Sequence, residues 1–488
     1  MRSVIHELRV LQGIVGEALD ELEELYTNPP QDDARAKAMD FPSLNKMYDP
    51  NTAEEAMTAT PEVARAISLI VAAASQLSAS VQHPFLTICD AATAYHLPAC
   101  LRVFEACGAV ELMKEAGEKG VSIETIAENC PGGKVDSRRL AHIFRLLATH
   151  HIIIEVSPGD VFALNRISGC LVTHPEPSPA SAALRKPEDK YVDTNGIAAY
   201  IGLCTDELFK ASAYLLESLL VRPQYEMDEE CSPAHKIEAE ETESEEREQE
   251  FRLARFGRAM TGTTSIEGYG GIWNALDWLA LPKGSLVVDV GGGIGSTSVM
   301  LARGGMKDMG ARFIVQDRGA VCKLGEEVCT VFFSCAIIKL MMIVEHDFFT
   351  PQPEHLKGPA VYLLRVVLHD WADPLCRKIL LRLRQAVIPG KEDETKLVIA
   401  EFVLPLACNT DDGVVDGAVK SLAPPPLLAN LGKANASAYW MDLTMQCVFN
   451  SQERTLRELV DLALSAGWKV KTVRRGAGSL FSYVVAEP

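Results

Sequence analysis

A glycine-rich run in the second half of the chain has the composition of a ligand-binding loop. It extends from Asp289 to Gly295, with the sequence DVGGGIG, and lies between the apolar segment LVV and a helical pattern. Glycines at a turn between a strand and a helix let the backbone approach a ligand closely. The alternative is a tight turn that binds nothing, so the identity of the ligand has to come from the glycine spacing.

The glycine spacing separates the possible nucleotide ligands. Dinucleotide loops require Gly-x-Gly-x-x-Gly or Ala, but the third position falls on Ser296 counted from Gly291 and on Ser298 counted from Gly293. A Walker A loop is excluded because no Gly-Lys-Ser/Thr follows. Asp289, an acidic residue two positions before Gly-x-Gly-x-Gly, suits a cationic adenosyl ligand instead. The pattern therefore favours S-adenosylmethionine.

A second carboxylate follows the next expected strand. Asp317 ends the strand-like run RFIVQ, about 20 residues beyond the glycine loop, where a carboxylate can accept hydrogen bonds from both ribose hydroxyls. The alternative is that Asp317 only begins a turn.

The segment RVVLHDWADP, residues 365–374, is a second candidate for a functional site. His369 and Asp370 come just past the apolar strand VYLLRVVL, at the carboxyl edge of a sheet where ligands bind. Asp373 and Pro374 predict the N-cap and first turn of the next helix. A histidine at a strand end can also simply pack there, so its position is what favours chemistry.

Two glutamates are further candidates. Glu401 lies in the apolar strand KLVIAEFVL, where a carboxylate needs a partner, and the usual strand order would place it beside His369. Glu453, in NSQERTLREL, is predicted in the first turn of a helix that runs to Gly467. Its alternative role is to pair with the helix dipole, which requires no catalysis.

The elements that must position these residues alternate between strand and helix. From Lys283 onward the pattern predicts an α/β domain with a parallel sheet. The last two expected strands, WKVKTV and LFSYVVAE, predict an antiparallel hairpin at the sheet edge. The Ala- and Pro-rich connector between Glu401 and Glu453, residues 417–440, is expected to be a surface loop.

The N-terminal half is predicted to be mostly helical. An amphipathic helix spans residues 1 to about 27, and a second helix starts at Thr60 with proline at its first position. Leu140, Ile143, Phe144 and Leu147 share one helix face, and IIIEV and VFALN then flank the turn SPGD, as in a winged helix. We expect four parts: an N-terminal helix and linker (1–58), a winged-helix-like dimerisation domain (59–185), a helical connector with an acidic stretch (186–282) and the ligand-binding domain (283–488).

Charge and composition exclude several classes of protein. The chain has 47 Lys and Arg against 66 Asp and Glu, a net charge of −19 that repels phosphate backbones and anionic membranes. The 13 cysteines show no Cys-x-x-Cys, which argues against a disulfide framework and a structural zinc site. The longest apolar run is too short to cross a bilayer. We therefore expect a cytoplasmic protein without a membrane or nucleic-acid partner.

Taken together, these segments resemble the plant-type O-methyltransferases, the caffeate and flavonoid group with its fungal relatives. The resemblance covers roughly residues 60–488, and the motifs keep the family's order: DVGGGIG, VQDR, HDFF, RVVLHDW, VIAEFVLP and NSQERT. It implies a C-terminal Rossmann-like class I methyltransferase domain that binds S-adenosylmethionine. It also implies an N-terminal winged-helix domain that forms a homodimer, which the apolar faces of the helices before residue 110 favour independently.

The resemblance also implies roles for single residues. The catalytic base falls on His369, its neighbouring acid on Asp370, and two supporting carboxylates on Glu401 and Glu453. His369 would take the proton of a small hydroxyl acceptor, phenolic or polyketide-like, while both glutamates orient its ring, and no metal is required. The cofactor-binding positions are Asp289, Gly291, Gly293, Asp317, Asp347, Phe348 and, where the family often has Lys, Arg365.

Three features depart from the family's pattern. The segment Val328–Val344 is overlong and unusually apolar, and we expect it to fit the fold poorly. The acidic stretch Met227–Glu250 stands where relatives often carry aromatic residues near the acceptor. The third is the Ala- and Pro-rich connector between Glu401 and Glu453. A catalytically impaired scaffold of the same fold is therefore one alternative, although His369, Glu401 and Glu453 argue against it.

Two further hypotheses concern the substrate and the activity. The winged-helix pattern with Arg138, Arg139 and Arg145 would also suit a DNA-binding regulator, but the negative charge opposes it. A methyltransferase for nucleic-acid bases or nitrogen would carry Asn/Asp-Pro-Pro-aromatic after the fourth strand. The chain has its Asn-Pro-Pro at Asn28, followed by Gln31 and outside the ligand-binding domain.

Overall fold

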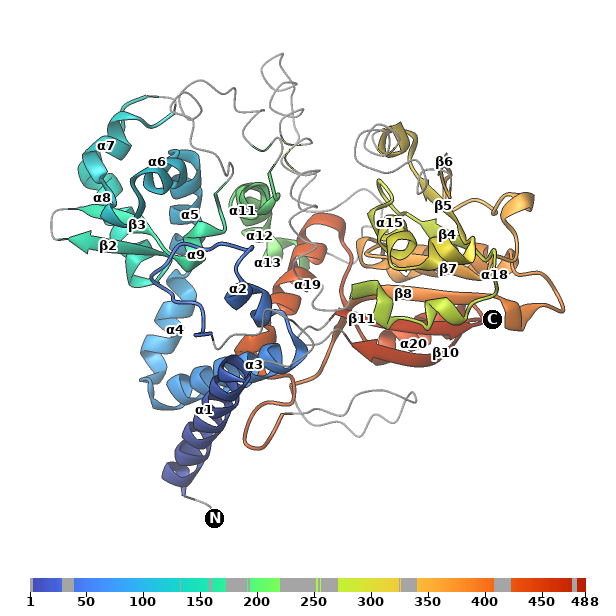
Figure 1. Ribbon diagram of the computed structural model, residues 1–488, viewed down its shortest axis with the longest axis horizontal. Coiled ribbons are helices and arrows are strands. Elements are labelled where there is room, and N and C mark those ends of the chain that lie inside the picture. The colour runs from blue at the N-terminus through green and yellow to red at the C-terminus, as the bar shows by residue number, and fades with distance from the viewer. Residues whose placement is uncertain are drawn as a thin grey trace. The chain divides into compact units, whose positions relative to one another are not determined.

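A computed structural model gives the fold of the chain (Figure 1). The chain divides into two compact units, residues 1–266 and 267–488, which are described separately. The structure describes residues 3–28, 39–131, 133–157, 160–172, 191, 194–219, 252, 255, 271–323, 325, 340–407, 423–475 and 481–488. The acidic stretch Met227–Glu250 lies outside the described residues, and the boundaries between the four predicted parts remain predictions.

The first unit begins with two long helices that pack on each other. Helix α1 (Val4–Thr27) and helix α3 (Pro61–Val81) match the two expected helices, and Thr60 is the N-cap of α3 with Pro61 in its first turn. Their contact buries small and branched side chains, including Ala18, Leu22 and Val63. The short helix α2 (Ala53–Thr58), which begins where Thr52 accepts a hydrogen bond from the Glu55 amide, lies in the segment that the sequence predicts to be a linker.

Helix α3 is long and apolar enough, by length and composition, to cross a membrane, which the sequence did not lead us to expect. Such a helix is weak evidence for a membrane span, because a core helix passes the same test. Here Val63, Ala66, Ala72 and Ala73 are buried, and Arg65 forms an ion pair with Glu21 of α1.

The next part of the first unit combines helices with a small antiparallel sheet. Helix α8 (Ser137–Thr149) buries Leu140, Phe144 and Leu147, and Ile143 packs against the same core, as its spacing predicts. Strands β2 (Ile153–Ser157) and β3 (Val161–Leu164) pair antiparallel after it, and β1 (Val121–Ser122) pairs with the other edge of β3. This confirms the expected helix and hairpin. The other helices described here are α4 (Pro84–Thr93), α5 (His96–Ala106), α6 (Ala109–Ala116), α7 (Ile123–Glu128), α9 (Arg166–Gly169), α11 (Ile197–Cys204), α12 (Glu207–Ser212) and α13 (Leu215–Leu219).

The second unit is built on one mixed sheet, whose strands run in the order β10-β11-β8-β7-β4-β5-β6, with β9 paired to β8 (Figure 1). Strands β6, β5, β4, β7 and β8 are parallel, β11 is antiparallel to β8, and β10 is antiparallel to β11. This confirms the α/β fold class and the C-terminal hairpin. The strands are β4 (Leu286–Val290), β5 (Arg312–Asp317), β6 (Met341–Glu345), β7 (Val361–Arg365), β8 (Lys396–Leu404), β9 (Arg454–Thr455), β10 (Lys469–Arg475) and β11 (Phe481–Glu487).

The central strands are apolar along most of their length because helices cover the sheet. On one face, side chains of α18 and α20 join a core with residues of β4, β7, β8 and β11. Trp468 is buried in this core, and its indole nitrogen donates to the Leu380 carbonyl at 2.9 Å. The helices are α15 (Ser296–Arg303), α18 (Asp373–Gln385), α19 (Ala436–Phe449) and α20 (Leu456–Ser465).

Three sequence expectations need correction in this unit. Strand β7 ends at Arg365, because the next residue, Val366, has a φ of 56° and turns the chain out of the sheet. Residues 341–344 belong to β6, which pairs in register with β5, so this part of the overlong segment is accommodated; residues 326–339 lie outside the described residues. The connector expected to be a loop ends in α19 from Ala436 onward.

The packing of α18 on the sheet supplies a test of the fold. Leu380 is fully buried, whereas Leu464 on α20 is 61% exposed. Leu380→Ala should lower the free energy of unfolding by about 2–5 kcal/mol, because it removes buried methyl groups and leaves a cavity. Leu464→Ala should change it by no more than about 0.5 kcal/mol. Urea unfolding followed by tryptophan fluorescence measures both, and equal effects would contradict this packing.

Candidate active site

The glycine loop joins β4 to α15, and two of its glycines are packed too tightly for larger residues. Gly291 has a φ of 69°, and a Cβ there would lie 2.9 Å from the Val367 side chain. A Cβ on Gly292 would lie 2.6 Å from the Asp289 carboxylate carbon. The loop therefore lies against both the carboxylate beneath it and the segment that follows β7.

Asp289 is a buried carboxylate under this loop. Its Oδ2 accepts a hydrogen bond from the Ser298 hydroxyl at 2.7 Å, while its Oδ1 is buried and has no partner among the described residues. Burial raises the pKa of Asp289 to about 6, although the Ser298 hydrogen bond and the charge of Arg365 oppose this. A buried oxygen without a partner is costly unless a donor or cation reaches it.

Asp317 reaches the loop from the end of β5. Its Oδ2 accepts a hydrogen bond from the Gly293 amide at 2.9 Å, and its Oδ1 accepts from the Arg318 amide at 2.8 Å. The backbone of β5 also contributes, because the Gln316 carbonyl accepts from the Gly291 amide at 2.8 Å. The structure thus brings together the glycine loop and the acidic residue that sequence spacing pairs with it.

The remaining predicted cofactor positions lie at the ends of neighbouring strands. Asp347 and Phe348 follow β6, and the Phe348 ring would be 3.8 Å from a Cβ on Gly291. The same ring packs edge-on against Trp371, with centroids 5.9 Å apart. Arg365 ends β7, and its guanidinium lies 5.7 Å from the Phe481 ring centroid.

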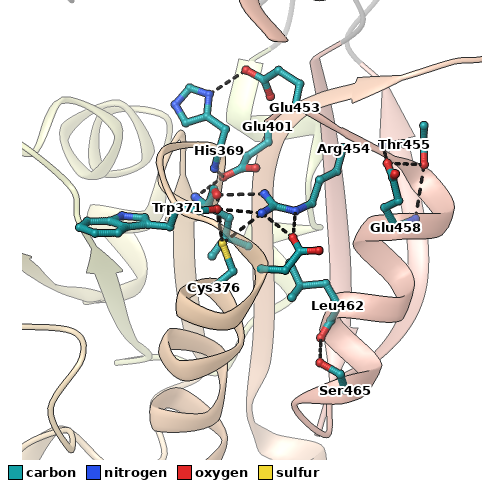
Figure 2. A network of polar contacts seen from close by, with 12 residues as sticks. His369, Trp371, Cys376, Glu401, Glu453, Arg454, Thr455, Glu458, Leu462 and Ser465 are labelled. Atoms are coloured by element: carbon teal, nitrogen blue, oxygen red, sulfur yellow. Dashed lines mark hydrogen bonds and ion pairs between the residues drawn. The ribbon is translucent and has the colours of Figure 1, made fainter. Parts of the chain in front are cut away.

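His369 and Glu453 form a buried pair, drawn in Figure 2. The distance from His369 Nδ1 to Glu453 Oε1 is 2.7 Å, and the side chains are 8% and 0% exposed. An ionised carboxylate only accepts hydrogen bonds, so Nδ1 carries the proton and Nε2 is the atom that can exchange one. Asp370 Oδ1 is 3.4 Å from Nε2.

The surroundings of His369 strongly favour its charged form. Burial lowers the pKa of His369, but the hydrogen bond and charge of Glu453, with Asp370 and Glu401 nearby, outweigh burial and raise it to about 9. The folded-state pKa is above the ordinary value of 6.5. The pair therefore stabilises the fold fully below about pH 6.5 and loses that contribution as the pH rises through about 9.

Glu401 acts on the backbone and not on the imidazole ring, which differs from the sequence expectation. Its Oε1 accepts hydrogen bonds from the amides of Val367 at 3.1 Å, Leu368 at 2.5 Å and His369 at 3.3 Å. Burial raises the pKa of Glu401, while the charges of His369 and Arg454 oppose that rise. Glu401 therefore holds the turn that carries His369, the 3₁₀ turn η9 (Leu368–Asp370).

Glu453 also differs in its secondary structure. It precedes β9 and lies before the N-cap of α20, which is Thr455, so it is not in the first helical turn. Glu458 occupies that turn and completes a capping box with Thr455. Glu458, and not Glu453, is therefore the residue placed to pair with the helix dipole. The amide of Glu453 instead donates a hydrogen bond to Asp442 of α19 at 2.9 Å. The N-cap of α18 is likewise Ala372, one residue before the predicted Asp373.

The comparisons with known proteins agree with this architecture. An O-methyltransferase domain family matches residues 235–414. An O-methyltransferase of Armillaria gallica is 35% identical over 474 residues, covering 96% of this chain and 95% of its own. The 4-O-methyltransferase 1 of Phanerochaete chrysosporium is 34% identical and covers 99% of both chains. The chain belongs to the O-methyltransferase family.

Solved structures show the same fold at low sequence identity. OxaC, solved with sinefungin and meleagrin, superposes with a TM-score of 0.63 at 18% identity and covers 98% of both chains. CalO1, a methyltransferase of calicheamicin biosynthesis solved with S-adenosylhomocysteine, gives 0.56 at 20% identity and covers 83% of this chain and 97% of its own. The family match and the fungal relatives confirm the resemblance to S-adenosylmethionine-dependent O-methyltransferases in the fungal branch.

The residues of this O-methyltransferase fit a cationic adenosyl cofactor. Two carboxylates, Asp289 and Asp317, contact the glycine loop, and one of them has a buried oxygen without a partner among the described residues. Gly293, with a φ of 60°, faces open space, since a Cβ there would meet no atom within 4 Å. Within the part of the chain that the structure describes, no group of three His, Cys, Asp or Glu could hold a metal ion.

Sequence reasoning missed two residues of the O-methyltransferase site. Arg454 is 2% exposed and contacts the turn that carries His369, and Asp442 holds the backbone of Glu453. Arg454 stands next to Glu453 in NSQERT, and this adjacency to a candidate residue is the signal that could have found it. Asp442 gives no comparable signal, because the sequence before it predicts a loop.

The buried pair predicts how His369 titrates in this O-methyltransferase. Glu453→Gln removes the charge that opposes burial, so the pKa of His369 should fall by at least about one unit. Glu458→Gln removes the same charge from the capping box nearby and should leave the pKa in place. NMR titration of ¹⁵N-labelled histidine, assigned with His369→Ala, measures both. An unchanged pKa in Glu453→Gln would refute the pairing.

Proposed function

We propose that this enzyme moves a methyl group to a hydroxyl of a small secondary metabolite, phenolic or polyketide-like, with His369 as general base. The observation that carries the proposal is the buried His369–Glu453 pair, which leaves Nε2 as the exchanging atom. This pair stands just past β7, next to the strand that leads into the glycine loop. A base beside a cofactor loop is the arrangement that methyl transfer to oxygen requires.

The cofactor would be held at the carboxyl ends of the parallel strands. S-adenosylmethionine, when bound, supplies a methyl group on a positively charged sulfur that a nucleophilic oxygen can attack. The acidic side chains at these positions suit its positive charge, and Asp317 is proposed to accept the ribose hydroxyls. The residues proposed to hold it are Asp289, Gly291, Gly293, Asp317, Asp347, Phe348 and Arg365.

His369 would accept the acceptor's proton at Nε2. A phenol has a pKa of about 10 and is a poor nucleophile at neutral pH. The pKa of His369, about 9, is close to that of the phenol, so the proton moves between groups of similar affinity. Nδ1 keeps its hydrogen bond to Glu453 throughout, which holds the ring in one orientation. Nε2 has to be neutral first, so kcat/KM, which reports the free enzyme, rises with pH toward about 9.

Asp370 is proposed to stabilise the imidazolium that forms when His369 accepts the proton. Its carboxylate lies 3.4 Å from Nε2, and its side chain is 38% exposed. Burial raises the pKa of Asp370, and the nearby His369 charge opposes this. A carboxylate at this distance would stabilise the protonated ring.

A screen of acceptors tests the proposed substrate class. The relatives are named as O-methyltransferases, one of them a 4-O-methyltransferase, which supports a hydroxyl acceptor. Phenols, polyketide phenols, aromatic amines and thiols would be incubated with the enzyme and methyl-labelled S-adenosylmethionine. Label should enter the hydroxylated compounds. Preferential methylation of amines or thiols would refute the proposed acceptor class.

The roles of His369 and Asp317 can be separated by two substitutions. His369→Ala removes the proton acceptor but no cofactor residue, so turnover should fall about 10²- to 10⁴-fold while calorimetric affinity for S-adenosylmethionine changes little. Asp317→Ala removes the proposed ribose contacts and should weaken cofactor affinity itself. Near-native turnover of His369→Ala at neutral pH would refute the general-base role.

A homodimer through the N-terminal half and a cytoplasmic location belong to the same proposal. Helix α4 exposes large apolar side chains, with Phe85 at 67% and Ile88 at 68%, which supports a partner surface there. Wild-type protein should be a dimer by light scattering at micromolar concentration. The double variant Phe85→Glu, Ile88→Glu should be a monomer, and Leu464→Glu, on an exposed site of α20, should remain a dimer. A monomeric wild type would contradict the proposal.

A further inference from the structure

Arg454 is buried against the turn that carries His369. Its Nη1 donates to the Leu368 carbonyl at 2.9 Å, and its Nη2 donates to the Trp371 carbonyl at 2.8 Å. Its charge is balanced by Asp373, whose Oδ1 accepts from Nε at 3.0 Å and from Nη2 at 2.8 Å. Figure 2 shows the guanidinium reaching across to Trp371 and Cys376. Its planar fork thus joins two carbonyls of one turn to the start of α18.

Glu401 holds the same turn through its backbone amides. That carboxylate accepts the amides of Val367, Leu368 and His369, whereas Arg454 takes carbonyls. The segment needs such support because Val366, just before it, has a φ of 56°, a conformation that costs a β-branched residue free energy. Two buried side chains of opposite charge therefore fix this strained backbone: Glu401 binds its amide donors, and Arg454 binds its carbonyl acceptors.

The position of Arg454 follows from β9. This short strand pairs with β8, with Arg454 opposite Val403, two residues after Glu401. Adjacent residues of an extended chain point to opposite sides. Glu453 and Arg454 therefore separate, with the carboxylate on the His369 ring and the guanidinium on the backbone of the same turn. One dipeptide thus contacts both the ring of the histidine and the backbone that carries it.

We propose that Arg454 is a positioning residue for the reaction: it holds the backbone of residues 368–371 so that His369 keeps its ring in register with Glu453. This inference rests on the proposed role of His369 as general base. The hydrogen bonds of the Arg454 guanidinium go to the turn, to Asp373 and to Cys376, not to the imidazole or the glycine loop. Its effect on turnover is therefore exerted through the turn.

Arginine is required at this position because the N–H donors of its guanidinium point in different directions and reach several acceptors at once. Lysine keeps the charge, but its single ammonium group cannot donate to the Leu368 and Trp371 carbonyls and also to Asp373 in the same fixed geometry. Cys376, whose Sγ contacts the same two carbonyls at 3.1 and 3.0 Å, remains in place and keeps the turn partly satisfied. Arg454→Lys should therefore fold, but with a looser turn.

The test compares turnover with binding in Arg454→Lys. We expect kcat to fall about 10- to 100-fold, because a displaced base is costly even when all reacting groups remain. The KM for the acceptor and the calorimetric affinity for S-adenosylmethionine should stay near wild type. Arg377→Lys is the matched control, since Arg377 donates to the Ser465 carbonyl from an exposed site on the same helix as Cys376. It should keep wild-type turnover.

Two outcomes would overturn the inference. One is a kcat of Arg454→Lys close to wild type, and the other is a loss of cofactor affinity as large as the loss of turnover, which would indicate general damage. Arg454→Gln, with an amide able to donate to one carbonyl, provides a second variant and should lose at least as much turnover. If His369→Ala is inactive while both Arg454 variants are active, only this inference fails. If His369→Ala is active, the proposed function fails as well.

Discussion

The hydrogen bond between Glu453 and His369 is the interaction on which the rest of the site depends. It joins a carboxylate with no exposed surface to an imidazole that is nearly buried. Removing one partner of a buried pair leaves an uncompensated charge or an unsatisfied polar group, at a cost of about 3–5 kcal/mol. The fold therefore has to position both side chains accurately, although 84 residues separate them in the sequence. The histidine is positioned by the turn that follows strand β7, and the glutamate lies in the link between α19 and β9.

The position of His369 depends on a backbone that leaves the sheet abruptly after β7. The left-handed conformation of Val366 directs the chain away from β7, so the next three amides lose their ladder partners and take Glu401 as acceptor instead. A carboxylate in the middle of an apolar strand is thus satisfied by backbone groups, and the same bonds fix the turn. Core packing beneath the sheet supplies the rigidity that makes this arrangement hold.

Sequence patterns predict the parts of the structure whose signals are local. Strands β4, β5 and β8, the C-terminal hairpin, the start of α3 and the glycine loop all follow from periodicity and turn residues. The contacts of Glu401 could not be predicted, because its partners are backbone amides freed by the conformation of Val366, and a valine gives no sign of a positive φ. The predicted secondary structure of Glu453 was wrong because Thr455 and Glu458 form the capping box after it. Helix α19 was missed because its sequence follows a stretch rich in Ala and Pro, and the role of Asp442 was missed with it.

The raised pKa of His369 has a consequence that follows from the arrangement of charges. Glu453, Asp370 and Glu401 all favour a protonated ring, and a ring that is protonated at neutral pH cannot accept a proton. A positive charge bound nearby would repel the imidazolium and lower its pKa, since like charges disfavour each other. The carboxylates that contact the glycine loop suit a cationic ligand. Binding such a ligand would therefore lower the pKa of His369 and favour the neutral ring that the proposed general-base role needs.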